Sequence, residues 1–332
     1  MSCYLQEMLN DSMIDFLKNK KILFIAFDLS GYYSGVYQEI KKYAQVDYYN
    51  TAEISYHYEH VIKKIGSFFY KILTGKNLKN LYRYKNLIAE VGNQSYDITL
   101  IVRPDLFFDS QLSVLKKSTK YFIAYYHDSI NNIKRKSQII HYFDKVYSYE
   151  KIDVKNYDLS FLPNFIYFAD SNDSNQDNTG AFSVMSKDYR LPTLKKVAEF
   201  LRSKKVGYQF YVMDRSKVKD DFVILMPKRM TNQEVIENIK KSKIIVDIHK
   251  YGIQEGLTFR VFEAIGFKRK LITTNKDIKS YDFYNPNNIH VIEDVNKIVI
   301  PDSFFESDYQ DIPQEIYNKY TVQSWLKTIF SC

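Results

Sequence analysis

Short apolar runs alternate along the chain with longer stretches that carry apolar residues at helical spacing. The run Lys21–Phe27 (KILFIAF) is typical of a buried strand and ends at a turn that contains Asp28, Ser30 and Gly31. Similar runs predict strands at Val46–Tyr49, Asp97–Val102, Lys120–Tyr126, Lys145–Tyr149 and Leu159–Leu162. Helices are predicted over Tyr37–Tyr43 and Tyr58–Val91. This alternation indicates a mainly parallel sheet covered on both faces.

The pattern pauses at Asp170–Gly180 (DSNDSNQDNTG), a polar segment rich in turn formers that we expect to be a linker. It then restarts, with strands predicted at Ala181–Met185, Tyr208–Met213, Phe222–Met226, Ile244–Ile248 and Lys270–Thr274. Helices are predicted at Leu191–Lys204, Thr231–Lys241, Leu257–Phe267 and Val322–Phe330. Thr231 and Glu234 have the spacing of a capping box.

The predicted fold class is therefore α/β, with two Rossmann-like domains facing a cleft. We expect a first domain over residues 1–165, a linker over 166–180 and a second domain over 181–315. The terminal segment, residues 316–332, is expected to pack back on the first domain. In open parallel sheets ligands bind beyond the carboxyl ends of the strands, so the residues that follow each strand are the candidates for chemistry.

Composition narrows the class of protein. The 332 residues are 45% hydrophobic and 26% charged, as in a globular protein, and the net charge of +8 favours anionic partners. Without a zinc finger, an RNA-binding aromatic signature or a helix-turn-helix, we expect no nucleic-acid partner. No window is apolar enough to span a bilayer, and Glu7, Asp11 and Asp15 interrupt the N-terminal apolar stretch. Cys3 and Cys332 have no metal-ligand spacing, and we expect a cytoplasmic protein.

Several common motifs are absent from the sequence. With ten glycines and no Gly-x-Gly-x-x-Gly, the chain does not match a dinucleotide oxidoreductase. It has no Gly-x-Ser-x-Gly elbow and no Asp-x-Asp pair. We therefore expect neither a cofactor nor a metal requirement.

The most informative segment runs from Ile244 to Thr274 and combines a strand, a glycine-containing loop and a helix. Backbone amides at the start of that helix favour a phosphate, and Arg260 adds a cation one turn in. Glu263, three residues on, shares roughly the same helix face and could accept hydrogen bonds from a ribose diol. The alternative is a solvated ion pair on an outer face.

Five motifs in the sequence resemble those of a known enzyme family. The motifs are QEGLTFRVFEAIGFKRKLITTN from Gln254, YDFYNPNNI from Tyr281, YYHDSINNIK from Tyr125, YFDKVYSYEKID from Tyr142 and FLPNF from Phe161. Together they are similar to bacterial lipopolysaccharide or capsule biosynthesis glycosyltransferases of the GT-B type, over about residues 97–290. One departure is His127, where related chains often have Trp.

The resemblance implies a GT-B fold, a nucleotide-sugar donor in the second domain and a glycan or lipid-linked oligosaccharide acceptor at the cytoplasmic face of the inner membrane. Glu255 and Glu263 look like the paired glutamates of GT-B enzymes, of which the second holds the donor ribose. The segment Gln254–Arg260, with Gly256 and Thr258, also resembles β-Kdo transferases, which implies a CMP-sugar donor.

Candidate groups for catalysis follow the strands of the first domain. Asp128 is a candidate general base or nucleophile, and His127 is a second candidate base. Asp128 could instead cap the following helix. Arg103 and Asp105 could bind acceptor or sugar, or could form a structural ion pair.

Further candidates lie beyond other strands. Asp28 and Ser30 are expected on the acceptor side. Ser186 and Arg190 are placed to bind donor phosphate, although Arg190 could be a solvated surface residue. His249 is a candidate phosphate or sugar contact, or a structural histidine.

The stretch Val61–Lys85 combines an apolar stripe with seven basic residues, Lys63, Lys64, Lys71, Lys76, Lys79, Arg83 and Lys85. Such a helix can lie on an anionic membrane, or its apolar stripe can face the core. We expect the stripe to face the core and assign any membrane attraction to the lysines.

The function expected from the sequence is transfer of a sugar, hexosyl or Kdo, from a nucleotide-activated donor to a cell-surface glycan. A nucleotide-sugar epimerase of the same fold and a non-catalytic sugar-nucleotide-binding scaffold protein remain alternatives.

Overall fold

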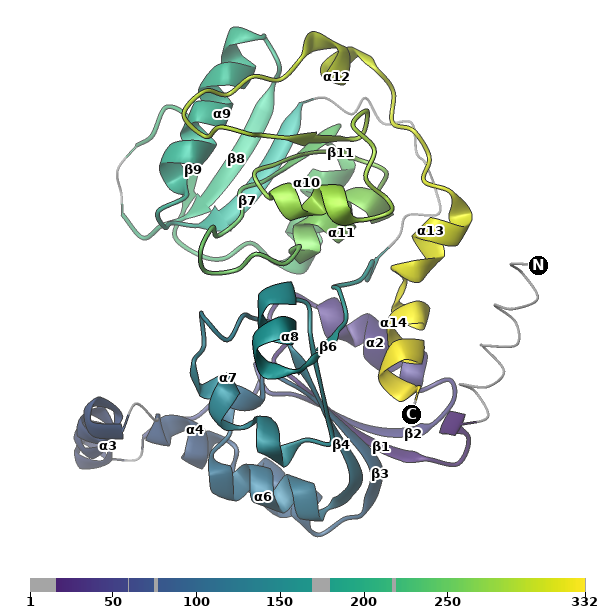
Figure 1. The fold of residues 1–332 in the computed structure, drawn as a ribbon. Helices are drawn as coiled ribbons and strands as arrows, with labels where there is room; N and C mark the ends of the chain where they lie inside the picture. The colour runs from purple at the N-terminus through teal and green to yellow at the C-terminus, as the bar shows by residue number, and fades with distance from the viewer. Residues whose placement is uncertain (1–15, 59, 75–76, 169–179, 217–218, 332) are drawn as a thin grey trace. The chain divides into compact units, whose positions relative to one another are not determined.

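The computed structural model describes residues 16–58, 60–74, 77–168, 180–216 and 219–331. Most of the predicted linker, residues 169–179, lies outside these ranges, as do both cysteines and the N-terminal acidic residues. The chain divides into two compact units (Figure 1). Unit 1 contains Met1–Leu162 and Trp325–Cys332, and unit 2 contains Pro163–Ser324. Unit 2 thus begins at Pro163, a few residues before the end of the predicted first domain.

Unit 1 is built on a six-stranded sheet in which every pairing is parallel. Its strands are β1 (Lys21–Ala26), β2 (Gln45–Asn50), β3 (Tyr96–Val102), β4 (Thr119–Tyr126), β5 (Lys145–Ser148) and β6 (Ser160–Phe161). They lie in the order β2-β1-β3-β4-β5-β6, so the strand order reverses between β1 and β3. That reversal is where ligands bind in sheets of this kind.

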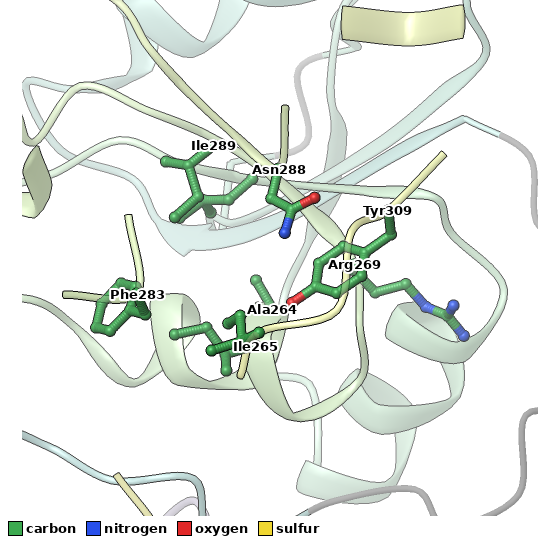
Figure 2. Close-up of a pocket in the computed structure, with 9 residues that line it drawn as sticks. Ala264, Ile265, Arg269, Phe283, Asn288, Ile289 and Tyr309 are labelled. Carbon is green, nitrogen blue, oxygen red and sulfur yellow. The ribbon is translucent and has the colours of Figure 1, made fainter. Parts of the chain in front are cut away.

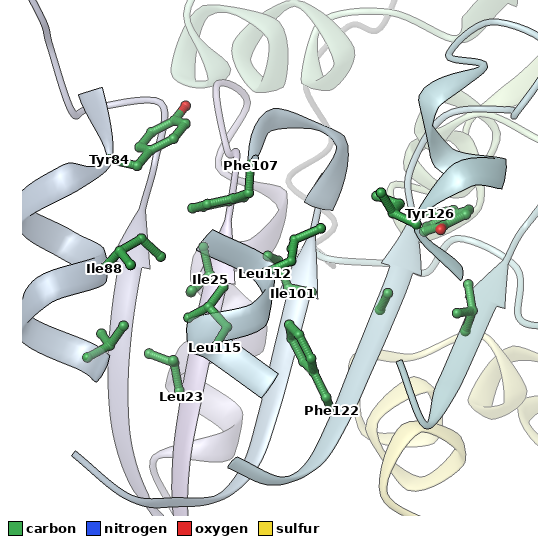
Figure 3. Close-up of a cluster of buried hydrophobic side chains, with 14 of the residues drawn as sticks. Leu23, Ile25, Tyr84, Ile88, Ile101, Phe107, Leu112, Leu115, Phe122 and Tyr126 are labelled. Atoms are coloured by element: carbon green, nitrogen blue, oxygen red, sulfur yellow. The ribbon is translucent and has the colours of Figure 1, made fainter. Parts of the chain in front are cut away.

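Helices lie between these strands, and one helix joins unit 1 from the C-terminal part of the chain. They are α2 (Tyr32–Ile40), α3 (Val61–Thr74), α4 (Leu78–Arg83), α5 (Lys85–Gly92), α6 (Asp109–Lys117), α7 (Arg135–Gln138), α8 (Lys151–Tyr157) and α14 (Val322–Phe330). One face of the sheet packs against α5 and α6, where Leu23, Ile101 and Phe122 meet Ile88 and Leu115 (Figure 3). Burial of these side chains supplies much of the stability of unit 1.

The C-terminal residues contribute to unit 1 through α14. Its Trp325 is buried and contacts Tyr125 edge to face, with ring centroids 5.0 Å apart. The hydroxyl of Tyr147 donates a hydrogen bond to the carbonyl of Thr328, 2.8 Å away.

Unit 2 repeats the architecture with a second six-stranded parallel sheet. Its strands are β7 (Ala181–Ser186), β8 (Tyr208–Met213), β9 (Ile224–Met226), β10 (Ile244–Asp247), β11 (Lys270–Thr273) and β12 (Ile289–Val291). Its helices are α9 (Leu191–Ser203), α10 (Asn232–Lys240), α11 (Phe259–Gly266), α12 (Asp302–Glu306) and α13 (Gln314–Lys319).

The strand order of unit 2 is β12-β11-β10-β7-β8-β9, which reverses between β7 and β10. These two strands pair only through Ile244 with Ala181 and Ile245 with Phe182, so the rest of β7 continues without β10 as a ladder partner. Two all-parallel sheets with connecting helices confirm the predicted α/β class with two Rossmann-like domains.

The structure corrects the expectation for the stretch Tyr58–Val91. It forms three helices, α3, α4 and α5, instead of one continuous helix. The isoleucine, leucine and phenylalanine side chains of α3 are exposed, so the prediction that the apolar stripe faces the core is wrong. The physical reason is that α5 and α6 already cover this face of the sheet, and the buried cluster between them and the sheet contains none of the α3 side chains that the structure describes.

Candidate functional site

In unit 2 the candidate residues gather where β7 and β10 separate. Arg190, just after β7, donates from Nη1 to the carbonyl oxygen of Ile248, just after β10, at 2.8 Å. Its guanidinium also forms an ion pair with Asp188 at 2.8 Å, so the alternative of a solvated surface arginine is wrong. Ser186 ends β7 and is exposed. Arg190 therefore bridges the carboxyl ends of two strands at the reversal point.

His249 lies in the same region and is buried. Its Nδ1 is 2.9 Å from the hydroxyl of Thr274, and its Nε2 is 3.5 Å from a carboxylate oxygen of Glu255. Burial lowers the pKa of His249, although the nearby carboxylates of Asp247 and Glu255 act in the opposite direction. The neutral imidazole is thus favoured at physiological pH. His249 is therefore suited to hydrogen bonding and is not a fixed positive charge.

The loop before α11 is held by its own polar groups. Glu255 accepts a hydrogen bond from the backbone amide of Gly252, whose φ of 73° lies in the left-handed region that glycine tolerates best. Asn275 donates to the carbonyl oxygens of Glu255 and, at 3.5 Å, Gly256. The backbone amide of Gln254 donates a hydrogen bond to the carbonyl oxygen of Lys250. The loop is therefore ordered around the start of α11.

Thr258 is the N-cap of α11 and has two roles. Its hydroxyl oxygen accepts from the amide of Arg260 at 3.2 Å and lies 3.2 Å from Oδ1 of Asp247. The other oxygen of Asp247, Oδ2, is buried without a hydrogen-bond partner among the described residues. Burial raises the pKa of Asp247, whereas Arg190, Arg260 and His249 lower it. A buried carboxylate oxygen of this kind calls for a donor, such as a hydroxyl group.

Arg260 and Glu263 form an ion pair within α11. Glu263 is only 1% exposed, and its other carboxylate oxygen accepts from the hydroxyl of Tyr167 at 2.7 Å. Burial raises the pKa of Glu263, opposed by Arg260 and Tyr167. The alternative of a solvated pair on an outer face is therefore wrong. Because both oxygens of Glu263 are engaged, it orients Arg260 in this state.

A small cavity in unit 2 borders α11 at residues other than Arg260 and Glu263. It is lined by Ala264 and Ile265 of α11 together with Leu271, Ile289 and Tyr309 (Figure 2). Its volume of about 10 Å³ is roughly that needed by one water molecule. It is too small for a nucleotide and does not include the residues at the β7–β10 reversal.

In unit 1 the candidates follow β3 and β4, next to the reversal point of that sheet. Arg103 donates to both carboxylate oxygens of Asp105 at 2.9 Å and lies 3.1 Å from Oδ2 of Asp128. Its φ of 64° is uncommon for a residue with a side chain, and such conformations gather at functional sites. Arg103 thus forms ion pairs with both Asp105 and Asp128.

Asp128 does not occupy the cap position of the next helix, because α7 begins at Arg135 with Lys134 as its N-cap. Its backbone carbonyl accepts from the ammonium group of Lys136, which is fully buried. Burial lowers the pKa of Lys136 to about 8, although Asp105 and Asp128 act to raise it. Nothing in the sequence distinguishes Lys136 from a solvated lysine, because it lies in the basic run KRK.

His127 is fixed by a tyrosine of α2 that no sequence motif singles out. Nδ1 of His127 lies 2.6 Å from the hydroxyl of buried Tyr33 on α2. Asp28 accepts from the amides of Ser30, Tyr32 and Tyr33 and so binds the start of α2. The carboxylate of Asp28 therefore has a structural task here, and the acceptor-side role expected for Asp28 and Ser30 stays a prediction.

Within the part of the chain that the structure describes, no group of three His, Cys, Asp or Glu residues is arranged to hold a metal ion. Within the same part, no helix is long and apolar enough to cross a membrane.

No family model and no curated protein sequence matches the chain. Solved structures do match it. The glycosyltransferase AviGT4, involved in avilamycin A biosynthesis, superimposes with a TM-score of 0.57 at 7% identity, over 93% of this chain and 95% of that one. The catalytic domain of starch synthase IV from Arabidopsis thaliana, bound to ADP and acarbose, gives 0.53 at 10% identity, over 95% and 96%. At such identities the likeness concerns the fold alone: the chain has the GT-B architecture of these glycosyltransferases.

Proposed function

We propose that this protein is a glycosyltransferase that moves a sugar from a nucleotide-activated donor to a cell-surface glycan. Two features support this proposal. The fold is shared with glycosyltransferases over nearly the whole chain. Polar and charged side chains also gather at the strand-order reversal of each sheet, where ligands of such sheets bind.

The observation that carries the proposal is the network in which Arg260 and the buried Glu263 of α11 meet Tyr167. Glu263 holds the guanidinium of Arg260, and Tyr167 holds Glu263. A guanidinium fixed in this way near a helix N-terminus suits a phosphate, because its position is set before the ligand arrives and the helix dipole favours negative charge. We assign Arg260 to the donor phosphates, with Arg190 and His249 nearby.

The donor ribose or sugar needs hydrogen-bond acceptors for its hydroxyl groups. The sequence motifs assign this role to Glu263, whose two oxygens already accept hydrogen bonds from Tyr167 and Arg260 and keep lone pairs for a further hydroxyl. Oδ2 of Asp247 is buried and has no hydrogen-bond partner among the described residues, so it can accept a hydrogen bond from a hydroxyl group without breaking an existing one. We therefore propose that Asp247, together with Glu263, accepts hydrogen bonds from hydroxyl groups of the nucleotide sugar.

For the transfer step, we assign Asp128 or His127 of unit 1. As a general base, Asp128 would take the proton of the acceptor hydroxyl while that oxygen attacks the anomeric carbon. The bond from the anomeric carbon to the donor phosphate would break, and the nucleotide would leave with the electron pair. As a nucleophile, Asp128 would instead attack the anomeric carbon while its bond to the donor phosphate breaks and the nucleotide leaves, which gives a covalent glycosyl intermediate. The acceptor hydroxyl would then attack the anomeric carbon, release the Asp128 carboxylate and lose its proton to a base such as His127. Arg103 holds the carboxylate of Asp128 in either case.

The acceptor class and the sugar rest on the sequence motifs. They point to lipopolysaccharide, lipooligosaccharide or capsule as acceptor, and to a hexosyl or, from Gln254–Arg260, a Kdo-type sugar. The proposed reaction needs no metal, because Arg260 and the α11 N-terminus would balance the charge of the leaving nucleotide.

A thermal-shift screen with a chelator present tests donor binding. UDP-, GDP-, ADP-, dTDP- and CMP-linked sugars and the free nucleotides are compared, since a ligand that binds the folded state raises its stability by about 2.7 kcal/mol at a hundredfold excess over its Kd. We expect a shift with one nucleotide class. No shift with any of them would contradict the proposal.

A further inference from the structure

Helix α3 presents its apolar side chains to solvent. Ile62, Ile65, Phe68, Phe69, Ile72 and Leu73 are between 51% and 83% exposed. The one buried side chain described on this helix is polar: Ser67, which accepts a hydrogen bond from the hydroxyl of Tyr58 at 2.7 Å. An ordinary surface helix buries its apolar stripe against the core, whereas α3 exposes its apolar stripe and buries a polar residue.

The positions of these residues around the helix agree with this arrangement. At about 100° per residue, the six exposed apolar side chains span an arc of roughly 140°. Ser67 lies on the opposite side, toward the segment that contains Tyr58. Helix α4 contacts α3 and lies between it and the sheet in the view of Figure 1. The apolar face is therefore continuous along α3 and points away from unit 1.

The charge of α3 indicates what covers this face. The helix sequence VIKKIGSFFYKILT contains Lys63, Lys64 and Lys71 and no acidic residue. Lys63 and Lys64 are exposed, and Lys79, Arg83 and Lys85 follow on α4 and α5. A continuous apolar face flanked by lysines complements an anionic lipid surface, in which the apolar residues enter the acyl boundary and the ammonium groups stay with the headgroups.

We propose that α3 docks this protein on an anionic membrane surface by lying in the plane of the interface. With 14 residues the helix is about 21 Å long, too short to cross the hydrocarbon core. A second copy of the chain fits this face less well, since two α3 helices packed together would bring their lysines together without an acidic residue on either helix. The proposal does not depend on the donor site in unit 2.

Vesicle flotation of the full chain tests the proposal, with phosphatidylcholine alone or mixed with phosphatidylglycerol. The parent protein is expected to float with the anionic vesicles and much less with neutral ones. A variant with Ile65→Gln, Phe69→Gln and Ile72→Gln should bind at least about tenfold more weakly, because it loses the apolar insertion. Lys63→Gln with Lys64→Gln should weaken binding about fivefold per charge and reduce its salt dependence.

The matched control substitutes exposed apolar residues elsewhere, Ile152→Gln, Ile224→Gln and Val299→Gln, and should bind like the parent. Because the substituted α3 positions are exposed, the variant is expected to fold, which circular dichroism and thermal unfolding verify.

Three outcomes would overturn the proposal. The parent could fail to bind anionic vesicles, or the α3 variant could bind as well as the parent. The parent could also form dimers that the α3 variant loses, with no vesicle binding, which would assign the face to a second copy. None of these measurements uses a nucleotide sugar, so their failure is distinct from failure of the proposed transferase function.

Discussion

Arg103 holds the carboxylate of Asp128 at 3.1 Å while donating to both oxygens of Asp105. If Asp128 is the base or nucleophile, Asp128→Asn should lower turnover by about 100-fold or more while donor affinity stays the same. Asp105→Asn is the matched control, because it removes the other carboxylate from the same guanidinium. Its loss of turnover should be much smaller. Equal losses in both variants would mean that the ion pair is structural and that Asp128 has no chemical role.

Arg260 is predicted to contact the donor phosphates. Arg260→Gln should weaken donor binding by about 10- to 100-fold, which corresponds to the loss of a charge-assisted hydrogen bond. Combining it with Glu263→Gln avoids leaving a buried, unpaired carboxylate. The control is Arg269→Gln in the same unit, since Arg269 donates to the carbonyls of Ile239 and Lys240. Calorimetric titration measures the Kd for the donor in each variant. If the Arg260→Gln variant and the Arg269→Gln control had the same Kd, Arg260 would not belong to the site.

The burial of Lys136 predicts how the free energy of unfolding depends on pH. Burial lowers its pKa to about 8 in the folded protein, against about 10.4 in an unfolded chain. Between these values the unfolded chain binds more protons, so the contribution of Lys136 to the free energy of unfolding rises with pH. Relative to Lys136→Met, the parent should gain on the order of 2–3 kcal/mol between about pH 7.5 and pH 10.5. Denaturant titrations that give a constant difference between the two proteins would disprove the pKa shift.

Gly266 at the end of α11 leaves no room for a side chain. A Cβ there would lie 2.6 Å from the carbonyl oxygen of Phe168 and 2.7 Å from Cγ2 of Ile166. Gly266→Ala should therefore cost about 1–3 kcal/mol of stability. At Gly207 a Cβ would meet nothing within 4 Å, so Gly207→Ala should change stability by less than about 1 kcal/mol. Denaturant titration compares the two, and a harmless Gly266→Ala would refute this packing.

The strand pattern and the capping signals were readable from sequence because they are local. The first six residues of KILFIAF form β1, and Thr231 and Glu234 form the predicted capping box of α10. Boundaries were less accurate: the helix expected from about Leu257 begins at Phe259, after its Thr258 cap, and β9 begins at Ile224 instead of Phe222. Ends of elements depend on caps and pairing partners, which a single segment does not reveal.

What the sequence did not reveal depends on contacts between distant segments. The burial of Lys136 follows from its packing beside Tyr126 and its bond to Asp128, and Tyr167 meets Glu263 across 96 positions of sequence. The apolar periodicity of α3 was read correctly, but the side that faces the protein is decided by α5 and α6 occupying the sheet. Periodicity shows that a helix has an apolar face and does not show what covers it.

The most direct test of the transferase account is a transfer assay read by mass spectrometry. The protein is incubated with the donor class selected by binding and with lipooligosaccharide or capsule acceptor, in parallel with Asp128→Asn. The account predicts an acceptor heavier by one sugar residue and release of the nucleotide, both lost in the variant. Conversion of the donor sugar without any acceptor would instead identify an epimerase, and binding without turnover of either substrate would identify a scaffold; each result would contradict the account.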